Sequence, residues 1–166
     1  MPLSRIRVND LCNRCGIHRR TFYNHFRDVY DLTAWIFNQT VDAYLPGDSG
    51  NPGTAGIIIA LERLKENAPF FRVALQEDSQ NALGRHILNH DIQIYEKELQ
   101  RITGKTDISR TNRFAIRYYC YGSLGTIYNW LFSGCQLSPE EMADLMISVM
   151  PPVLHDIFGR NSHSPV

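Results

Sequence analysis

A short stretch near the start of the chain combines cationic, hydrogen-bonding and aromatic side chains on two faces of one expected helix. It reads Ile17-His18-Arg19-Arg20-Thr21-Phe22-Tyr23-Asn24-His25-Phe26. Phe22 and Phe26 are one helical turn apart and mark a buried side, whereas Arg20 and Asn24 project from the opposite side. Such a helix can anchor itself to its own domain and offer donors to a polyanion. These are the properties that a DNA-reading helix needs.

The charge of the chain is distributed unevenly, although its net value is zero. Residues 1–31 hold six arginines, no lysine and three acidic residues, a net charge of +3, and the remainder of the chain carries −3. A basic end on an acidic body indicates a nucleic-acid contact confined to that end. Arginine suits bidentate contacts with phosphate or guanine. A solvated arginine-rich surface is the alternative that charge alone leaves open.

The apolar spacing predicts that two helices and a tight turn position these side chains. Residues 8–15 carry apolar side chains at 8, 11, 12 and 15, which is the stripe of an amphipathic helix. Gly16 then ends that helix, because it tolerates left-handed backbone, and a second helix is expected from 18 to 26. Cys12 is small enough to lie where the two helices cross. The apolar residues expected to lock the second helix are Leu11, Cys15, Ile17 and Phe22. This pattern predicts a helix-turn-helix.

The remaining sequence predicts further helices and no strand. They are expected at about 28–44, 57–65, 70–75, 83–102 and 111–134 and from Ser138 on, with a short continuation at 153–158. Ser138-Pro139-Glu140-Glu141 predicts a capping box. We therefore expect an all-α chain with three parts. They are a DNA-binding helix-turn-helix domain in 1–45, a loop rich in glycine and proline in 46–56, and a C-terminal ligand-binding and dimerisation bundle in 57–160.

Composition and cysteine spacing argue against several other classes of protein. No apolar run reaches the roughly 18 to 20 residues of a membrane span, and the N-terminus lacks an apolar signal core, so a cytoplasmic protein without membrane contact is expected. Cys12 and Cys15 form a C-x-x-C, but Cys120 and Cys135 lie far away. We expect both members of the pair to pack inside a helical domain, with no metal, other cofactor or disulfide. No set of nucleophile, base and orienting group is present, so an enzyme is not expected.

The N-terminal residues resemble the TetR/AcrR family of transcriptional regulators. The matching segments are Ile6-Arg7-Val8, Cys15-Gly16-Ile17 and the run from Arg20 to Asp28, whose core is Thr21-Phe22-Tyr23-Asn24-His25-Phe26. Residues 30–37, with 118–125, 130–134 and 138–141, are most similar to the branch related to the dihydroxyacetone kinase regulator. The resemblance implies a homodimeric, effector-responsive regulator that binds double-stranded operator DNA.

The resemblance also implies which residues meet DNA. In this family the start of the recognition helix contacts bases or phosphates in the major groove. Here that assigns DNA contact to Arg7, His18, Arg19, Arg20, Thr21, Tyr23, Asn24 and His25. The hydroxyl of Tyr23 and the imidazole of His25 can donate to phosphate oxygens, and packing is the other interpretation of both. Two residues depart from the family pattern: His18 stands where a serine or threonine usually caps the helix, and Val29 stands where a lysine commonly grips phosphate.

A third departure concerns the first helix of the DNA-binding domain. TetR-type domains have three helices, and the first of them precedes the Ile-x-Val entry. Only residues 1–5 precede Ile6 here, so the sequence predicts a domain that lacks this helix. Either the true start lies further upstream or this version binds DNA poorly. The alternative function is therefore a co-regulator that binds a partner protein, with weak or lost DNA binding.

A long aromatic helix followed by a methionine-rich helix is expected to form the dimer interface. Gly122 and Gly125 lower the stability of the long helix, but they permit close approach of another helix. The residues expected at this interface are Tyr121, Gly122, Gly125, Tyr128, Met142, Leu145, Met146 and Val149. A core within one chain is the alternative for this set.

The effector is either a small molecule or a partner protein, and the sequence does not define its pocket. The polar or aromatic candidates along the central helices are Phe70, Phe71, His86, His90 and Tyr95. Core packing or surface exposure is the other interpretation of each.

Overall fold

The computed structural model describes residues 2–41, 53–76 and 83–158, and every regular element within these ranges is helical. A short 3-10 turn, η1 (Leu3–Arg5), precedes α1 (Val8–Cys15), α2 (Arg19–His25) and α3 (Val29–Thr40). The later elements are α4 (Gly53–Glu66), α5 (Ala68–Leu75), α6 (Leu83–Thr103), α7 (Arg110–Phe132), α8 (Pro139–Ser148) and α9 (Pro152–Phe158). The predicted all-α fold is confirmed.

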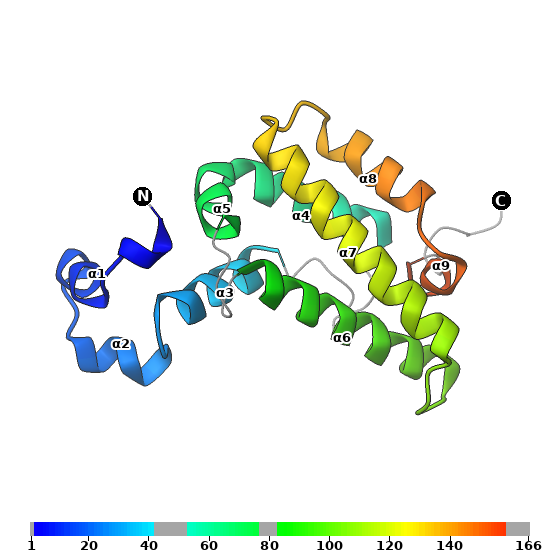
Figure 1. Cartoon of the computed structure of the whole chain (residues 1–166), viewed down its shortest axis with the longest axis horizontal. Coiled ribbons are helices and arrows are strands. Elements are labelled where there is room, and N and C mark those ends of the chain that lie inside the picture. Colours follow the sequence, from blue (N-terminus) through cyan, green and yellow to red (C-terminus); the bar gives the residue numbers. More distant parts are fainter. Residues whose placement is uncertain (1, 42–52, 77–82, 159–166) are drawn as a thin grey trace.

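The helices form a slender end and a thicker body. Figure 1 shows α1 and α2 at one end of the molecule, joined through α3 to a bundle made of α4 to α9. In the bundle, α6 and α7 lie side by side, α8 packs on α4, and α5 packs on α7. Helix α3 packs on both α4 and α6. It is therefore the element through which the body can influence the slender end.

Local capping signals set several of the helix ends. Gly16 adopts left-handed backbone with φ 65°, and its amide donates to the carbonyls at the end of α1. At the start of α8, the Glu141 amide donates to Ser138 Oγ at 3.1 Å, and Glu141 Oε2 accepts from the Ser138 amide at 2.8 Å. The predicted capping box is therefore confirmed. Asp28 caps α3 in a similar way, because its carboxylate accepts from the Asp31 amide at 2.8 Å.

The predicted loop at 46–56 is wrong at its C-terminal end, because α4 already begins at Gly53. Gly56 and Ile57 are both buried, so packing of this turn on the body stabilises helix that the glycine content alone disfavours. Residues 46–52 lie outside the described residues, as do the predicted end of the third helix at 42–44 and the last two residues of the predicted 57–160 domain.

The largest fully buried side chains all lie in the body, and they are Phe71, Leu61, Ile116, Leu131, Met142, Leu154 and Cys120. At the slender end, Cys12 and Phe22 are buried, but they stand outside the continuous core. Leu3 in η1 and Val29 at the start of α3 do belong to that core. The segment that contains α1 and α2 is therefore attached to the body by residues on both sides of it.

Candidate nucleic-acid interface and internal cavity

Helix α2 is held in place by one face and presents its polar residues on the other. The side chain of Phe22 is 4% exposed, and its ring packs on the Phe26 ring with centroids 5.5 Å apart. The Phe26 ring meets the edge of Trp35 in α3 at a centroid distance of 5.7 Å. The predicted buried face of Phe22 and Phe26 thus joins α2 to α3. The opposite face of α2, which carries Arg20 and Asn24, is exposed.

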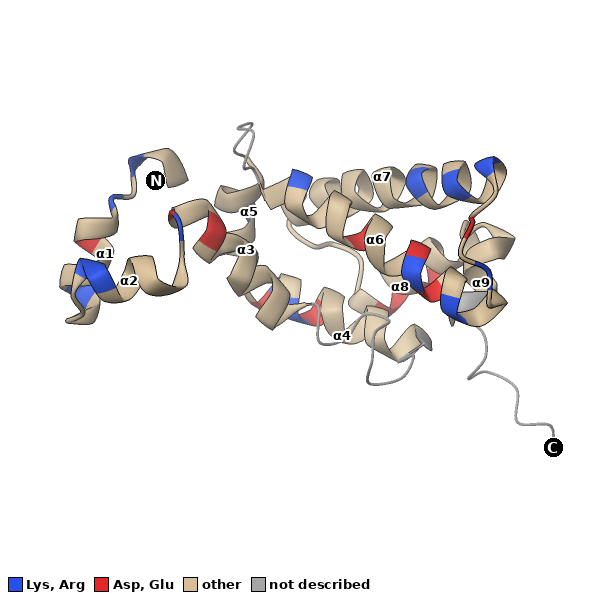
Figure 2. Ribbon diagram, turned by 90° about the horizontal axis from the view of Figure 1, so that it is seen from below, with Lys and Arg blue, Asp and Glu red and all other residues tan. Residues whose placement is uncertain are grey.

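The structure places all eight residues predicted to contact DNA on the surface, namely Arg7, His18, Arg19, Arg20, Thr21, Tyr23, Asn24 and His25. Figure 2 shows the basic positions of α1 and α2 gathered at the far end of the molecule. The guanidinium of Arg19 lies over the Tyr23 ring, 5.7 Å from its centroid, so the two side chains share one side of the helix. The His18 side chain makes no capping hydrogen bond, in agreement with its description as a weaker cap.

Two residues predicted to lock the motif do not do so. Ile17 is 42% exposed and Cys15 is also exposed, because nothing among the described residues covers this side of the turn. Cys12 is buried, as expected, and Leu11 is partly buried against the core. The prediction that both cysteines of the C-x-x-C pack inside the domain therefore holds for Cys12 and is wrong for Cys15.

The junction between α2 and α3 is fixed by Asp31. Its carboxylate accepts a hydrogen bond from the Arg27 amide at 3.0 Å and another from the Arg27 guanidinium at 3.3 Å. These two hydrogen bonds lower the pKa of Asp31 below its ordinary value, and the bond from the Arg27 amide has the larger effect. Val29, at the position where the family commonly has a lysine, is buried in the core. This position therefore stabilises the junction by packing and offers no charge to a phosphate.

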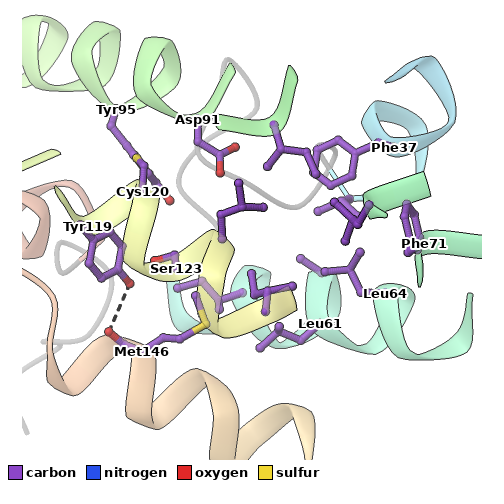
Figure 3. Close-up of a pocket in the computed structure, with 17 residues that line it drawn as sticks. Phe37, Leu61, Leu64, Phe71, Asp91, Tyr95, Tyr119, Cys120, Ser123 and Met146 are labelled. Atoms are coloured by element: carbon purple, nitrogen blue, oxygen red, sulfur yellow. Dashed lines mark hydrogen bonds between the residues drawn. The ribbon is translucent and has the colours of Figure 1, made fainter. Parts of the chain in front are cut away.

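The body encloses a cavity of about 70 Å³ between α3, α4, α5, α6, α7 and α8 (Figure 3). Most of its walls are aliphatic or aromatic, and the polar groups come from Asp91, Tyr95, Tyr119, Cys120 and Ser123. Burial raises the pKa of the Tyr119 phenol to about 12, and its hydroxyl donates to the Met146 carbonyl at 3.2 Å. Burial also raises the pKa values of Tyr95 and Cys120, so all three groups stay protonated at neutral pH.

Two residues at the end of α3, Phe37 and Val41, also line the cavity. A second link between α3 and the body lies nearby, where His86 Nε2 and Asn38 Oδ1 are 2.9 Å apart in a hydrogen bond. The His86 ring stacks on His90 with a centroid distance of 5.8 Å. The helix that directly follows α2 therefore forms part of the cavity wall.

The five pocket candidates taken from the sequence divide between different environments. Phe71 and Tyr95 line the cavity, whereas Phe70, His86 and His90 do not. The sequence-based selection missed Asp91, Cys120 and Ser123. Asp91 is one helical turn from the candidate Tyr95, and this spacing is the signal that could have found it.

A third feature is an exposed apolar face on α7 and α8. The most exposed of its large side chains are Tyr118 at 74%, Val149 at 73%, Phe114 at 68%, Tyr121 at 63% and Leu145 at 55%. They flank a groove that both helices line. Gly122 and Gly125 open onto the same face, and a Cβ built on either glycine would meet nothing within 4 Å. Packing within the chain therefore gives no reason for glycine at these positions.

The residues predicted for the dimer interface differ in exposure, and most but not all of them lie on the exposed face of α7 and α8. Tyr121, Gly122, Gly125 and Tyr128 in α7 are exposed, as are Leu145 in α8 and Val149, which caps its end. Met142 is 1% exposed and belongs to the core of its own chain, and it also lines the groove between α7 and α8. Met146 is partly buried and lines both the internal cavity and the groove between α7 and α8. The apolar stripe of α8 is thus wide enough to serve both a core and a surface.

Phe114 and Tyr118 were missed at the sequence level. Phe114, Tyr118, Tyr121, Gly125 and Tyr128 are spaced by four, three, four and three residues. This spacing is the seam pattern of helices that pack along their length. Extending the predicted set toward the N-terminus of α7 would have included both residues.

Several other kinds of site are absent from the described parts of the chain. In residues 2–41, 53–76 and 83–158, no three His, Cys, Asp or Glu side chains are grouped so that they could hold a metal ion. The four cysteines are free thiols. Of the helices that the structure describes, none combines the length and the apolar character that crossing a membrane requires.

Comparison with known proteins identifies the larger part of the chain. Residues 54–151 match the TetR-type family model described as the C-terminal region of transcriptional regulators. No curated protein sequence matches the chain. Among solved structures, the dihydroxyacetone kinase operon activator DhaS has the same fold, with a TM-score of 0.62 and 21% identity over 95% of this chain and 87% of that one. The predicted resemblance is confirmed: the chain belongs to the TetR family, as a transcriptional regulator and not an enzyme.

Proposed function

We propose that this regulator binds operator DNA through α2, acts as a homodimer and responds to an effector in the cavity of its body. One observation carries the DNA-binding part of the proposal. The eight residues predicted to contact DNA are all exposed, on a motif whose other side is anchored by Phe22. Arg19 and Arg20 can reach guanine edges or phosphates, and Tyr23 and His25 can hold phosphate oxygens.

The exposed face of α7 and α8 supports homodimerisation. Large apolar side chains gathered on one face mark an interaction site more often than a free surface. A second copy that packs here would bury Tyr118, Tyr121 and Val149, and the two open glycines would let its helix approach closely. Two copies form a four-helix interface of α7 and α8. A two-fold dimer then presents two α2 helices to half-sites about 34–36 Å apart.

The contacts of α3 support a response to an effector. Phe37 and Val41 line the cavity, and Asn38 is hydrogen bonded to His86 on α6, which is itself a cavity-lining helix. An occupant that fits one arrangement of α3 better than another shifts the population toward that arrangement. The resulting change in DNA affinity cannot exceed the differential affinity of the occupant for the two arrangements.

Fluorescence anisotropy at fixed salt tests the DNA-binding part, with labelled duplexes from the region upstream of the gene. Arg20→Ala should weaken binding by about 10-fold or more, the effect of losing a contact to a base edge or phosphate. Tyr23→Phe should weaken it less, because only a hydroxyl is lost. Arg85→Ala is the matched control, since this exposed arginine lies on α6 in the body. If neither Arg20→Ala nor Tyr23→Phe changes the affinity, the assigned face is wrong.

The alternative is a co-regulator that binds a partner protein, with weak or lost DNA binding. The exposed apolar side chains beside the motif favour it, because Ile17 is 42% exposed and Trp35 is 50% exposed. A salt titration of DNA binding separates the two functions. A partner-binding module retains only weak binding that added salt removes, whereas an operator-binding protein keeps a preference for one duplex over others at the same salt.

A further inference from the structure

We infer that a second copy of the chain crosses α7 in the antiparallel direction, with the two-fold axis between residues 121 and 122. Tyr121 of each copy then packs over Gly122 of the other. This inference rests on the proposed homodimer, and it adds the direction, the register and the side chain that each copy supplies to the other. It follows from the spacing of tyrosine and glycine on α7, from the charges near the ends of this helix and from the groove beside it.

Two tyrosines and two glycines occupy the face of α7 that points away from its own body. Tyr118 is 74% exposed and Tyr121 is 63% exposed, and a Cβ built on Gly122 or Gly125 would meet nothing within 4 Å. With 3.6 residues per turn, the four positions fall within about 100° of one another around the helix, and the buried Ile116 lies on the other side. The exposed face therefore carries two large side chains next to two gaps.

The order of these four residues makes the face complementary to itself. A two-fold axis perpendicular to α7 places a residue before the axis opposite the residue that lies equally far after it in the second copy. With the axis between residues 121 and 122, Tyr121 lies opposite Gly122, and Tyr118 lies opposite Gly125. Both pairs are within about 5 Å of the axis along the helix, so they stay close over a wide range of crossing angles.

This register is the only antiparallel one that places both tyrosines opposite glycines. The other two registers that place one of them opposite a glycine place the second tyrosine opposite another tyrosine. A glycine opposite a ring lets the two helices approach closely while the ring leaves water. The matched register therefore buries the two largest exposed side chains of this face without forcing the helices apart.

The charges near the ends of α7 favour the antiparallel direction. The first half of the helix carries three arginines and the helix has no acidic residue; the arginines are Arg110, Arg113 and Arg117. Arg113 is ion-paired with Glu96 of its own chain at 3.6 Å. The first turn of α8 carries Glu140 and Glu141, and Figure 1 shows α8 beginning near the C-terminal end of α7 and running back along it. A parallel crossing would bring the arginines of both copies together, whereas an antiparallel one brings them toward the acidic end of α8 in the other copy.

The groove between α7 and α8 can receive the ring of the second copy. Gly122 lines this groove. The inner wall of the groove is also a wall of the cavity in the body, because Tyr119, Ser123 and Met146 line both spaces. The Tyr119 hydroxyl donates to the Met146 carbonyl across this wall at 3.2 Å (Figure 3). Tyr121 of the second copy therefore covers the outer side of the cavity wall, so each copy supports the cavity of the other.

Disulfide cross-linking of the full chain tests the register. Tyr118→Cys and Gly125→Cys are made as separate variants in a Cys15→Ser background, which removes the exposed native thiol. Mixed and oxidised, they should form a linked dimer, because the Cα atoms of facing residues lie within the roughly 7 Å that a disulfide spans. Each variant alone should stay unlinked, since its two cysteines are roughly 10 Å apart along the helix. Arg85→Cys mixed with Gly125→Cys is the control for random collision, because Arg85 is exposed on α6.

Sedimentation equilibrium tests the contribution of the central tyrosine. Tyr121→Ala should weaken association by about 10-fold or more, the effect of losing an aromatic anchor at the centre of an interface. Tyr128→Ala is the matched comparison on the same helix and should weaken association less. Its ring lies about 10 Å along the helix from the axis and stacks on Phe132 of its own chain, with centroids 4.2 Å apart. Equal effects of the two variants would contradict a crossing centred on residues 121 and 122.

A measurement on the wild-type chain keeps the inference testable if a variant fails to fold. In a dimer of one isotope-labelled and one unlabelled copy, filtered NMR spectra should show cross-relaxation between the Tyr121 ring and the α protons of Gly122 in the other copy. A dimer without this signal overturns the inference.

Failure of this inference is distinguishable from failure of the proposed homodimer. A dimer in which Tyr118→Cys or Gly125→Cys links to itself, or in which the mixed pair links no faster than the control, overturns the register and leaves the homodimer standing. A chain that sediments as a monomer overturns the homodimer and the inference with it. A dimer that links only the mixed pair supports both.

Discussion

The α1–α2 end and the α4–α9 body differ in how many of their large side chains are fully buried. All seven of the largest fully buried side chains lie in the body, whereas the slender end depends on Cys12 and Phe22, which stand outside the continuous core. At that end Ile17 is 42% exposed, and Trp35 in the adjoining α3 is 50% exposed. The body also has exposed apolar side chains, on the face formed by α7 and α8, so the two regions differ in their buried packing and not in whether they expose apolar surface.

This difference teaches where conformational change costs least. Segments with few buried contacts open locally at low free energy, whereas densely packed segments open only with the whole domain. In this chain the proposed DNA-reading helix lies in the first kind of segment and the cavity in the second. A ligand that moves α3 slightly therefore acts on the adjoining α1–α2 segment, where a conformational change costs the least free energy.

The largest expected effect comes from truncating one buried side chain in each region. Leu131→Ala in the body should lower the free energy of unfolding by about 2–5 kcal/mol, because Leu131 is fully buried and its truncation leaves a cavity. Phe22→Ala should instead loosen α2 locally and reduce DNA affinity, with a smaller effect on global unfolding. Urea denaturation and amide hydrogen exchange measure the two effects. Equal loss of global stability in both variants would show that the end and the body unfold as one unit.

A smaller effect, whose sign is informative, is expected at Gly122. In an isolated chain Gly122→Ala should stabilise α7 by about 0.5–1 kcal/mol, because glycine disfavours helix and its Cβ would meet nothing. If a second copy packs here, the same methyl group weakens the dimer. Sedimentation equilibrium gives the association constant, and unfolding at low concentration gives the stability of the single chain.

Gly84→Ala is the matched control for that measurement. Its added Cβ would lie in ordinary contact with Leu124 and Leu75 inside the chain, 3.9 and 4.0 Å away. This variant should leave association unchanged. Equal association constants for the wild type and for Gly122→Ala would remove the support that the open glycines give to the dimer.

The smallest effect concerns the acid stability of the α2–α3 junction. The pKa of Asp31 is lowered in the folded chain, so its contribution is present above the ordinary carboxyl value of about 4 and is lost as the pH falls through the lowered value. The side chain of Asp31 is 30% exposed, which limits the contribution to a few tenths of a kcal/mol. Thermal unfolding as a function of pH should show a shallower acid limb in Asp31→Asn than in the wild type. Asp107→Asn, at an exposed position, should follow the wild-type curve.

Local signals explain which features of the fold could be predicted. The capping box at Ser138, the left-handed Gly16 and the buried face of Phe22 each depend on residues within a few positions in the chain. All three could therefore be predicted from the sequence alone. The start of α4 at Gly53 was missed, because the packing that stabilises it comes from the body. A rule based on glycine content has no access to that packing.

Some features of the candidate sites could not be predicted from the sequence, because they depend on how the helices pack together. Met142 and Leu145 have the same apolar character three residues apart, but Met142 is 1% exposed and Leu145 is 55% exposed, a difference that depends on how α8 packs on the other helices. Asp91 reads as one of several polar residues along an amphipathic helix. Its position in the lining of an apolar cavity becomes visible only once α3, α4 and α7 are placed beside α6.

The burial of Leu3 has a mechanical consequence for the slender end. Leu3 before α1 and Val29 after α2 both belong to the continuous core, and Ile6, Val8 and Leu11 between them pack against it. The segment that contains α1 is therefore fastened to the body on its N-terminal side as well as through α3. A backbone cut at Gly16 would leave the chain on each side of the cut in contact with the core.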